Sequence, residues 1–116
     1  MSFDFNNDSP IYLQIIEHIK MQIINKEYLP GAKLPSVREM SLIFEVNPNT
    51  IQKALGELEE LGLIFTERTN GKFVTLDEKL IMGITKDTVN KKIDDFLQDM
   101  SKMGISKKEI IEILKK

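Results

Sequence analysis

Several features that would support catalysis are scarce or missing in this chain of 116 residues. It has no cysteine, which excludes a disulfide framework, a thiol nucleophile and a sulfur-rich metal site. His18 is the only histidine, and no second ligand type lies at metal spacing beside it, so we expect a solvated histidine and not a metal ligand or general base. There is no glycine-rich loop of the kind that cradles phosphates. We therefore expect no enzyme activity, no metal and no cofactor.

The chain also lacks long apolar segments. No stretch approaches the roughly 20 apolar residues that span a bilayer. Residues 1–8 lack the basic start and apolar run of a signal peptide. We therefore expect a cytoplasmic protein with no membrane partner. A hydrophobic content of 41% with 29% charged residues is typical of globular proteins.

A basic excess is missing as well, because the formal net charge is −2. Residues 1–75 hold seven Lys or Arg against ten Asp or Glu, which counts against nucleic-acid binding. Local charge differs from the total, since five basic residues fall within residues 33–72, which hold the motifs described below: Lys33, Arg38, Lys53, Arg68 and Lys72. Three acidic residues are expected at the C-terminal end of the helix over 48–62, away from its polar tip: Glu57, Glu59 and Glu60.

Residues 46–65 have the pattern of a short recognition helix over 48–62. Asn47 is a good N-cap, Pro48 suits the first helical position, and Gly62 is placed to end the helix. Apolar residues at helical spacing form one stripe: Ile51, Ala54, Leu55, Leu58 and Leu61. The opposite face begins with polar residues that can reach base edges and phosphates: Asn49, Thr50, Gln52 and Lys53. Taken alone, these four side chains are explained more simply as a solvated helix face, because exposed polar residues are the default.

The flanking segments favour DNA recognition. Residues 35–44 are predicted to form a helix opened by a Ser36–Glu39 capping box, and the short connection to Asn47 matches a helix-turn-helix. The buried stripe of this helix should be Val37, Met40, Ile43 and Phe44. Strands over 63–68 and 72–75 should flank an Asn-Gly hairpin turn. An earlier helix over 10–26, capped by Ser9 or Asp8, should bury Ile11, Ile15, Ile16, Ile19, Ile23 and Ile24. Residues 33–34 could add a short strand.

These motifs carry a resemblance to a known family. The stretch from Pro10 to Val74 resembles the DNA-binding domain of the GntR family of bacterial transcription regulators. The matching pieces are Pro-Ile-Tyr-x-Gln-Ile at 10–15, Gly-x-x-Leu-Pro-Ser-x-Arg-Glu at 31–39, Asn-Pro-Asn-Thr at 47–50, Leu-x-Glu-Leu-Glu-x-x-Gly-Leu-Ile at 55–64 and Gly-x-Phe-Val at 71–74. The Asn-Pro-Asn-Thr run and the short tail are most similar to the YtrA subgroup, which suggests control of a transporter operon.

The resemblance and the motifs together give the DNA-binding residues that we expect. They are Ser36, Arg38, Asn47, Asn49, Thr50, Gln52, Lys53, Arg68, Asn70, Gly71 and Lys72. Arg38 matches the family arginine that contacts phosphate and base. For the wing, a contact from Arg68 or Lys72 is an open alternative to a purely structural turn.

The chain changes character after Val74. Asp77 should cap a long helix over 78–102, Gly104 should end it, and Ser106 with Glu109 should open a last helix. Because two amphipathic helices cannot bury both faces alone, we expect them to pair with the same helices of a second chain. The expected dimer interface is Leu80, Ile84, Val89, Ile93, Phe96, Leu97 and Met100. Asp94, Asp95 and Asp99 are expected to be a solvated face, and Met82, Met100 and Met103 to be packing residues and not an effector patch.

Three positions depart from the family pattern. Glu45 stands in the helix-turn-helix turn where glycine is common, and a positive φ there would cost about 1 kcal/mol. The tip of the recognition helix has one lysine and no arginine, so bidentate arginine contacts to guanine must come from elsewhere. The wing turn has one glycine, Gly71, where the family more often has two.

The sequence therefore predicts a mainly α fold with a small β-hairpin. Residues 1–76 should form a winged helix-turn-helix DNA-binding domain, and residues 77–116 a two-helix dimerisation tail. The expected function is sequence-specific binding of double-stranded DNA by a homodimeric regulator, acting as a repressor, at an inverted-repeat operator. The alternative is a winged-helix protein-interaction module without DNA binding. An unknown small-molecule effector stays open, although the tail is too short to enclose an ordinary ligand pocket within one chain.

Overall fold

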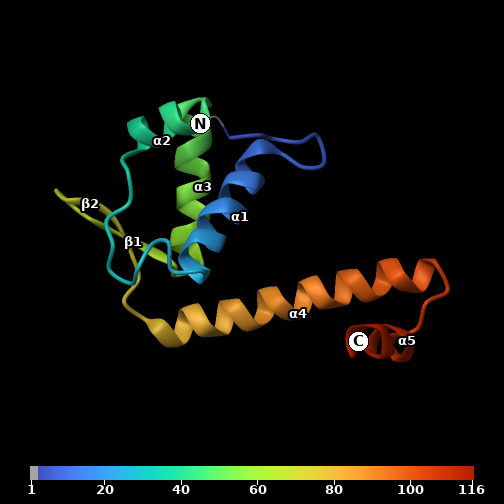
Figure 1. Cartoon of the computed structure of the whole chain (residues 1–116). Helices are drawn as coiled ribbons and strands as arrows, with labels where there is room; N and C mark the ends of the chain where they lie inside the picture. The colour runs from blue at the N-terminus through green and yellow to red at the C-terminus, as the bar shows by residue number, and fades with distance from the viewer. Residues whose placement is uncertain (1–2) are drawn as a thin grey trace. The chain divides into compact units, whose positions relative to one another are not determined.

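The computed structural model describes residues 3–116, so the first two residues of the predicted 1–76 domain lie outside the described residues. In chain order the elements are α1 (Ile11–Ile24), α2 (Val37–Phe44), α3 (Pro48–Glu60), β1 (Ile64–Glu67), β2 (Gly71–Val74), α4 (Glu78–Lys102) and α5 (Lys107–Leu114) (Figure 1). Contacts group them into two compact units, Met1–Met82 and Gly83–Lys116. The boundary falls inside α4, a few residues after the sequence-based limit at residue 76. This order of elements is the winged helix-turn-helix predicted from the sequence.

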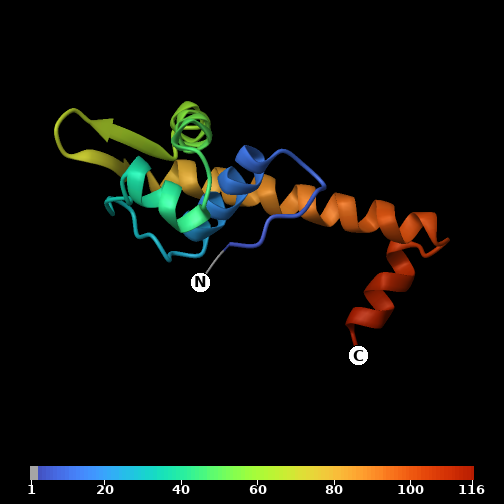
Figure 2. The same ribbon diagram turned by 90° about the horizontal axis from the view of Figure 1, so that it is seen from above.

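The first unit is built around α3, which contacts both α1 and α2. Most of its buried side chains come from the apolar stripes of these helices and the base of the hairpin: Ile15, Ile16, Ile19, Ile23, Met40, Phe44, Ile51, Ala54, Leu55, Leu58, Leu63, Ile64 and Val74. Figure 2 looks along α3 and shows the hairpin extending away from the helices. Since burying such a side chain contributes about 1.5–3 kcal/mol, this core fixes how the polar tip of α3 is presented.

Some sequence-based details were wrong. Ile11, Ile43 and Leu61 were expected in the core but are 43%, 51% and 46% exposed. Ile43 points aside because the eight-residue α2 packs through Met40 and Phe44. Leu61 follows the last residue of α3, where the chain turns through Gly62 at φ 82°. Pro10, and neither Ser9 nor Asp8, is the N-cap of α1, and no side chain caps that helix.

The hairpin forms where predicted, but β1 is shorter than expected and β2 starts one residue earlier, so Gly71 lies in a strand and not in the turn. β1 and β2 pair antiparallel, with Ile64 opposite Val74 and Glu67 opposite Gly71. Lys33 forms an isolated antiparallel bridge to Phe73, so the possible strand at residues 33–34 is present only as a single bridge pair. This bridge attaches the loop before α2 to the wing.

An aromatic cluster corrects the expectation that His18 is simply solvated. The ring centroid of His18 lies 4.7 Å from that of Phe3 and 5.7 Å from that of Phe44. Phe5 lies 4.6 Å from Phe3. Gln14 fixes the same N-terminal segment, because its side chain accepts from Asn6 N at 3.1 Å and donates to Asn6 O at 2.9 Å. His18 therefore packs with rings that anchor the segment before α1.

The helices after the hairpin begin and end as the sequence predicts. Asp77 Oδ1 accepts from Leu80 N at 3.0 Å at the start of α4, and the helix continues through Gly83. Gly104 has a φ of 77°, and Ser106 with Glu109 forms a complete capping box at α5. Within residues 3–116, no helix is both long and apolar enough to cross a membrane.

Candidate nucleic-acid interface

The connection between α2 and α3 is held by local hydrogen bonds. Glu45 adopts the left-handed conformation with φ 56° and ψ 48°, so the backbone cost considered for this turn position applies. Ser41 Oγ donates to the carbonyl of Val46, and Asn47 Oδ1 accepts from Asn49 N at 2.8 Å. With Pro48 in the first turn, these bonds fix the direction of α3 relative to α2. The tip of α3 is thus set on a rigid turn.

The tip of α3 presents the polar residues expected from the sequence. Asn49, Gln52 and Lys53 are exposed, and Thr50 is half-buried. Asn49, Thr50 and Lys53 line a concave surface of about 390 Å³, which Ile11 and Tyr12 of α1 complete. Gln52 lies outside this concavity. The α1 residues were not among the predicted contacts, although the Pro-Ile-Tyr motif at 10–12 was a usable signal.

A second cleft, of about 400 Å³, lies between the start of α2 and the wing. It brings five of the predicted DNA-binding residues together: Ser36, Arg68, Asn70, Gly71 and Lys72. Lys33 also lines it, and was not among the predicted contacts. Arg38 is exposed on α2 and lies outside the cleft. The predicted site is therefore two neighbouring surfaces of one unit, plus the exposed Arg38, Asn47 and Gln52.

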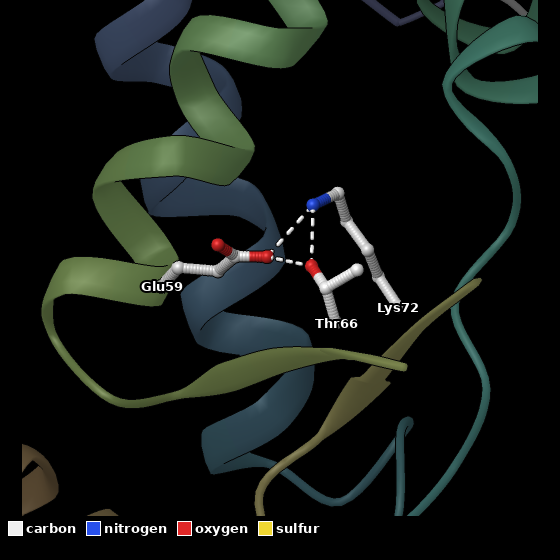
Figure 3. Close-up of polar contacts among 3 residues, drawn as sticks. All are labelled: Glu59, Thr66 and Lys72. Atoms are coloured by element: carbon white, nitrogen blue, oxygen red, sulfur yellow. Dashed lines mark hydrogen bonds and ion pairs between the residues drawn. The ribbon is translucent and has the colours of Figure 1, made fainter. Parts of the chain in front are cut away.

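Lys72 is held by a carboxylate. Its Nζ lies 2.7 Å from Glu59 Oε1 and 2.8 Å from Thr66 Oγ1, and Thr66 also donates to Glu59 (Figure 3). The Lys72 hydrogen bond, followed by that from Thr66, lowers the pKa of Glu59. The sequence placed Glu59 away from the tip of α3 but did not predict that the hairpin folds back onto it. Consequently, the positive charge of Lys72 is largely offset.

Two predicted contact residues have a structural role that accounts for them. Ser36 Oγ accepts from Glu39 N at 3.0 Å, and Glu39 Oε1 accepts from Ser36 N at 2.9 Å. The backbone hydrogen bond from Ser36, then that from its side chain, lowers the pKa of Glu39. Asn47 likewise uses its side-chain oxygen for the cap of α3. Asn47 keeps its side-chain NH2 group, from which a phosphate oxygen can accept, whereas both donors of Ser36 are directed at Glu39.

Arg38 and Arg68 differ from Lys72 because no carboxylate holds them. Both side chains are exposed, and in the part of the chain from residue 3 onward neither forms an ion pair. Guanidinium groups bind phosphate and guanine bidentately. These two arginines are therefore exposed cations that no carboxylate of residues 3–116 pairs with, one on the helix-turn-helix and one on the wing.

The predicted dimer residues do not form one face in the structure. Leu80 packs within the first unit, where a Cβ on Gly62 would lie 3.4 Å from both of its terminal methyl groups. At about 100° per residue, Leu80 and Ile84 lie roughly on the opposite side of α4 from Ile93 and Phe96. Val89, Ile93 and Phe96 are 48%, 48% and 47% exposed, while Ile84, Leu97 and Met100 are less so. An exposed apolar stripe is thus present from Val89 onward.

Comparison with known proteins agrees with this geometry. The family model for bacterial regulatory proteins of the gntR family matches residues 11–74. The HTH-type transcriptional repressor YtrA of Bacillus subtilis is 34% identical over 116 residues, covering 99% of this chain and 89% of YtrA. A GntR family transcriptional regulator from Listeria monocytogenes has 42% identity and a TM-score of 0.89, covering 96% of this chain and 97% of that one.

A further solved structure includes DNA. The DNA-binding domain of AraR in complex with operator ORX1 has 32% identity and a TM-score of 0.59, covering 65% of this chain and 95% of that one. The match over residues 11–74 includes α1 to β2, the elements that carry both candidate surfaces. The chain therefore belongs to the GntR family of bacterial regulatory proteins.

Proposed function

We propose that this protein is a sequence-specific DNA-binding repressor that acts as a homodimer on an inverted-repeat operator. The observation that carries the proposal is the tip of α3, where Asn49, Gln52 and Lys53 are exposed on a helix whose other face is fully buried. The repressor name of YtrA and the operator bound to the AraR domain support it. Action on DNA also implies a cytoplasmic location.

In this proposal α3 enters the major groove. Asn49, Thr50 and Gln52 contact bases or phosphates, since amide and hydroxyl groups can do both. Lys53 and Arg38 contact phosphate, and Arg38 can also reach a base. The wing lies along the adjacent minor groove with Arg68 as its main cation, because Lys72 is already paired with Glu59.

The dimer is proposed to form through α4 and α5. Val89, Ile93 and Phe96 would leave an apolar stripe in water in a single chain, and a two-fold interface would bury each of them twice. Phe96→Asp should therefore give a monomer by sedimentation at micromolar concentration and weaken operator binding by orders of magnitude. Gln98→Asp adds the same charge on the opposite side of α4 and should leave the dimer intact. A wild-type monomer, or tight operator binding by Phe96→Asp, would contradict the dimer.

The DNA-binding proposal is tested by selecting bound fragments from random duplex DNA and then titrating the recovered sequence against salt. We expect an inverted repeat, with an affinity that falls steeply as salt rises through counterion release. The recovered sequence would also locate the regulated genes and so test the suggested transporter operon. No enrichment and no salt-dependent DNA binding would instead favour a winged-helix protein-interaction module, which the net charge of −2 would suit.

A further inference from the structure

The concave surface between the first turns of α1 and α3 contains a cation–π contact. The Nζ of Lys53 lies 3.9 Å from the centroid of the Tyr12 ring. An ammonium within about 6 Å of a ring face is attracted by the ring quadrupole. In residues 3–116, Lys53 makes no ion pair, so this ring is the only partner that the structure gives its charge.

Resting on the proposed DNA binding, we propose that Tyr12 is a positioning residue for Lys53, holding its ammonium where a DNA phosphate arrives. The ring and the lysine belong to different helices, and they meet because α1 and α3 pack together through their buried stripes. They line the same concavity as Asn49 and Thr50. α1 therefore contributes to the DNA-binding surface through a residue outside the helix-turn-helix.

The contrast with Lys72 shows why an aromatic partner matters. Lys72 is held 2.7 Å from a carboxylate, which offsets its charge, and its bonds to Glu59 and Thr66 use two of its three N–H donors. A neutral ring restrains Lys53 but leaves its charge uncompensated and its N–H groups able to donate to phosphate oxygens. A free lysine side chain loses much rotamer freedom on binding, whereas Lys53 is already restrained in the free protein. Both lysine side chains are therefore restrained, but only Lys53 keeps an uncompensated charge for a phosphate.

The proposal is tested in two steps, of which the first needs no DNA. Aromatic ring current should shift the Cε protons of Lys53 upfield in the NMR spectrum of the free protein. The shift should persist in Tyr12→Phe, which keeps the ring, and disappear in Tyr12→Leu. An unshifted Lys53 resonance in the wild type would overturn the proposal.

The second step is a double-mutant cycle on affinity for the selected duplex. Tyr12→Leu should weaken binding about twofold to fivefold, the factor that corresponds to an exposed cation–π contact of about 0.5–1 kcal/mol. Tyr12→Phe should bind like the wild type. In a Lys53→Met background, Tyr12→Leu should cause no further loss, and thermal unfolding should show that each variant is folded.

The outcomes separate this proposal from the proposed function. If the wild type binds its selected duplex but Tyr12→Leu loses the same affinity with or without Lys53, Tyr12 acts independently and the proposal is wrong. The proposal also fails if Tyr12→Phe loses as much affinity as Tyr12→Leu, because the hydroxyl would then be the essential group. A wild type that binds no duplex at all would overturn both.

Discussion

Glu45 offers a sharp test of the local backbone argument. It has φ 56° and ψ 48°, and its N–H donates to the carbonyl of Ser41 at the end of α2. The left-handed conformation costs a residue with a Cβ about 1–2 kcal/mol, a cost that glycine avoids. Glycine also raises the conformational entropy of the unfolded chain, which lowers the free energy of unfolding by about 0.4–1 kcal/mol and so offsets part of this gain. Glu45→Gly should therefore raise the free energy of unfolding by about 0.5–1 kcal/mol, and the Tm by about 2–8 °C.

Circular dichroism during thermal and urea unfolding measures this change. Glu45→Ala is the matched control, since it removes the carboxylate but keeps the Cβ and should therefore show little or none of the gain. DNA affinity should stay similar for both, because the turn keeps its shape. If Glu45→Gly is no more stable than the wild type, or if Glu45→Ala gains equally, the stabilisation does not come from relieving backbone strain.

Other predictions concern the charged groups of the interface. Arg38→Ala should weaken specific DNA binding about tenfold with normal thermal stability, and an unchanged mobility-shift titration would remove Arg38 from the interface. Glu59→Gln should release Lys72, tighten DNA binding and steepen its salt dependence by about one phosphate contact, and an unchanged slope would refute this. The lowered pKa of Glu59 means that its ionised form stabilises the folded state. This stabilisation should be complete well above the ordinary glutamate pKa of about 4.3, and it should be lost as the pH falls through the lower folded-state pKa. Urea unfolding of the wild type and Glu59→Gln should then converge at low pH, and a constant difference would count against the ion pair.

The features that the sequence predicted correctly depend on neighbouring residues. The capping boxes at Ser36 and Ser106 and the cap at Asp77 each involve groups within a few positions of one another. Local hydrogen bonds and backbone sterics decide such features whatever the rest of the fold does. Because such local features mark where each helix and strand begins and ends, the order of the elements could be predicted from the sequence.

The features that the sequence missed depend on how elements pack. Tyr12 meets Lys53 only when α1 docks on α3, and Lys72 meets Glu59 only when the hairpin folds back onto α3. His18 could not be assigned to an aromatic cluster because Phe3 and Phe44 come from distant segments. Periodicity also overstated burial at Ile43, since a two-turn helix buries a narrower face than the pattern implies. Contacts between residues distant in sequence therefore determine which lysines of the candidate interface are paired with a carboxylate.

The central claim is that the exposed tip of α3 determines which DNA sequence is bound. The direct measurement compares the affinity for the selected operator with that for a scrambled duplex, in the wild type and in the double variant Thr50→Ala with Gln52→Ala. Glu60→Ala, at the exposed far end of α3, is the control. We predict that the double variant folds and keeps part of its phosphate-based binding but loses discrimination, whereas the control keeps it. Full discrimination by the double variant would mean that the wing or DNA shape, and not α3, selects the sequence.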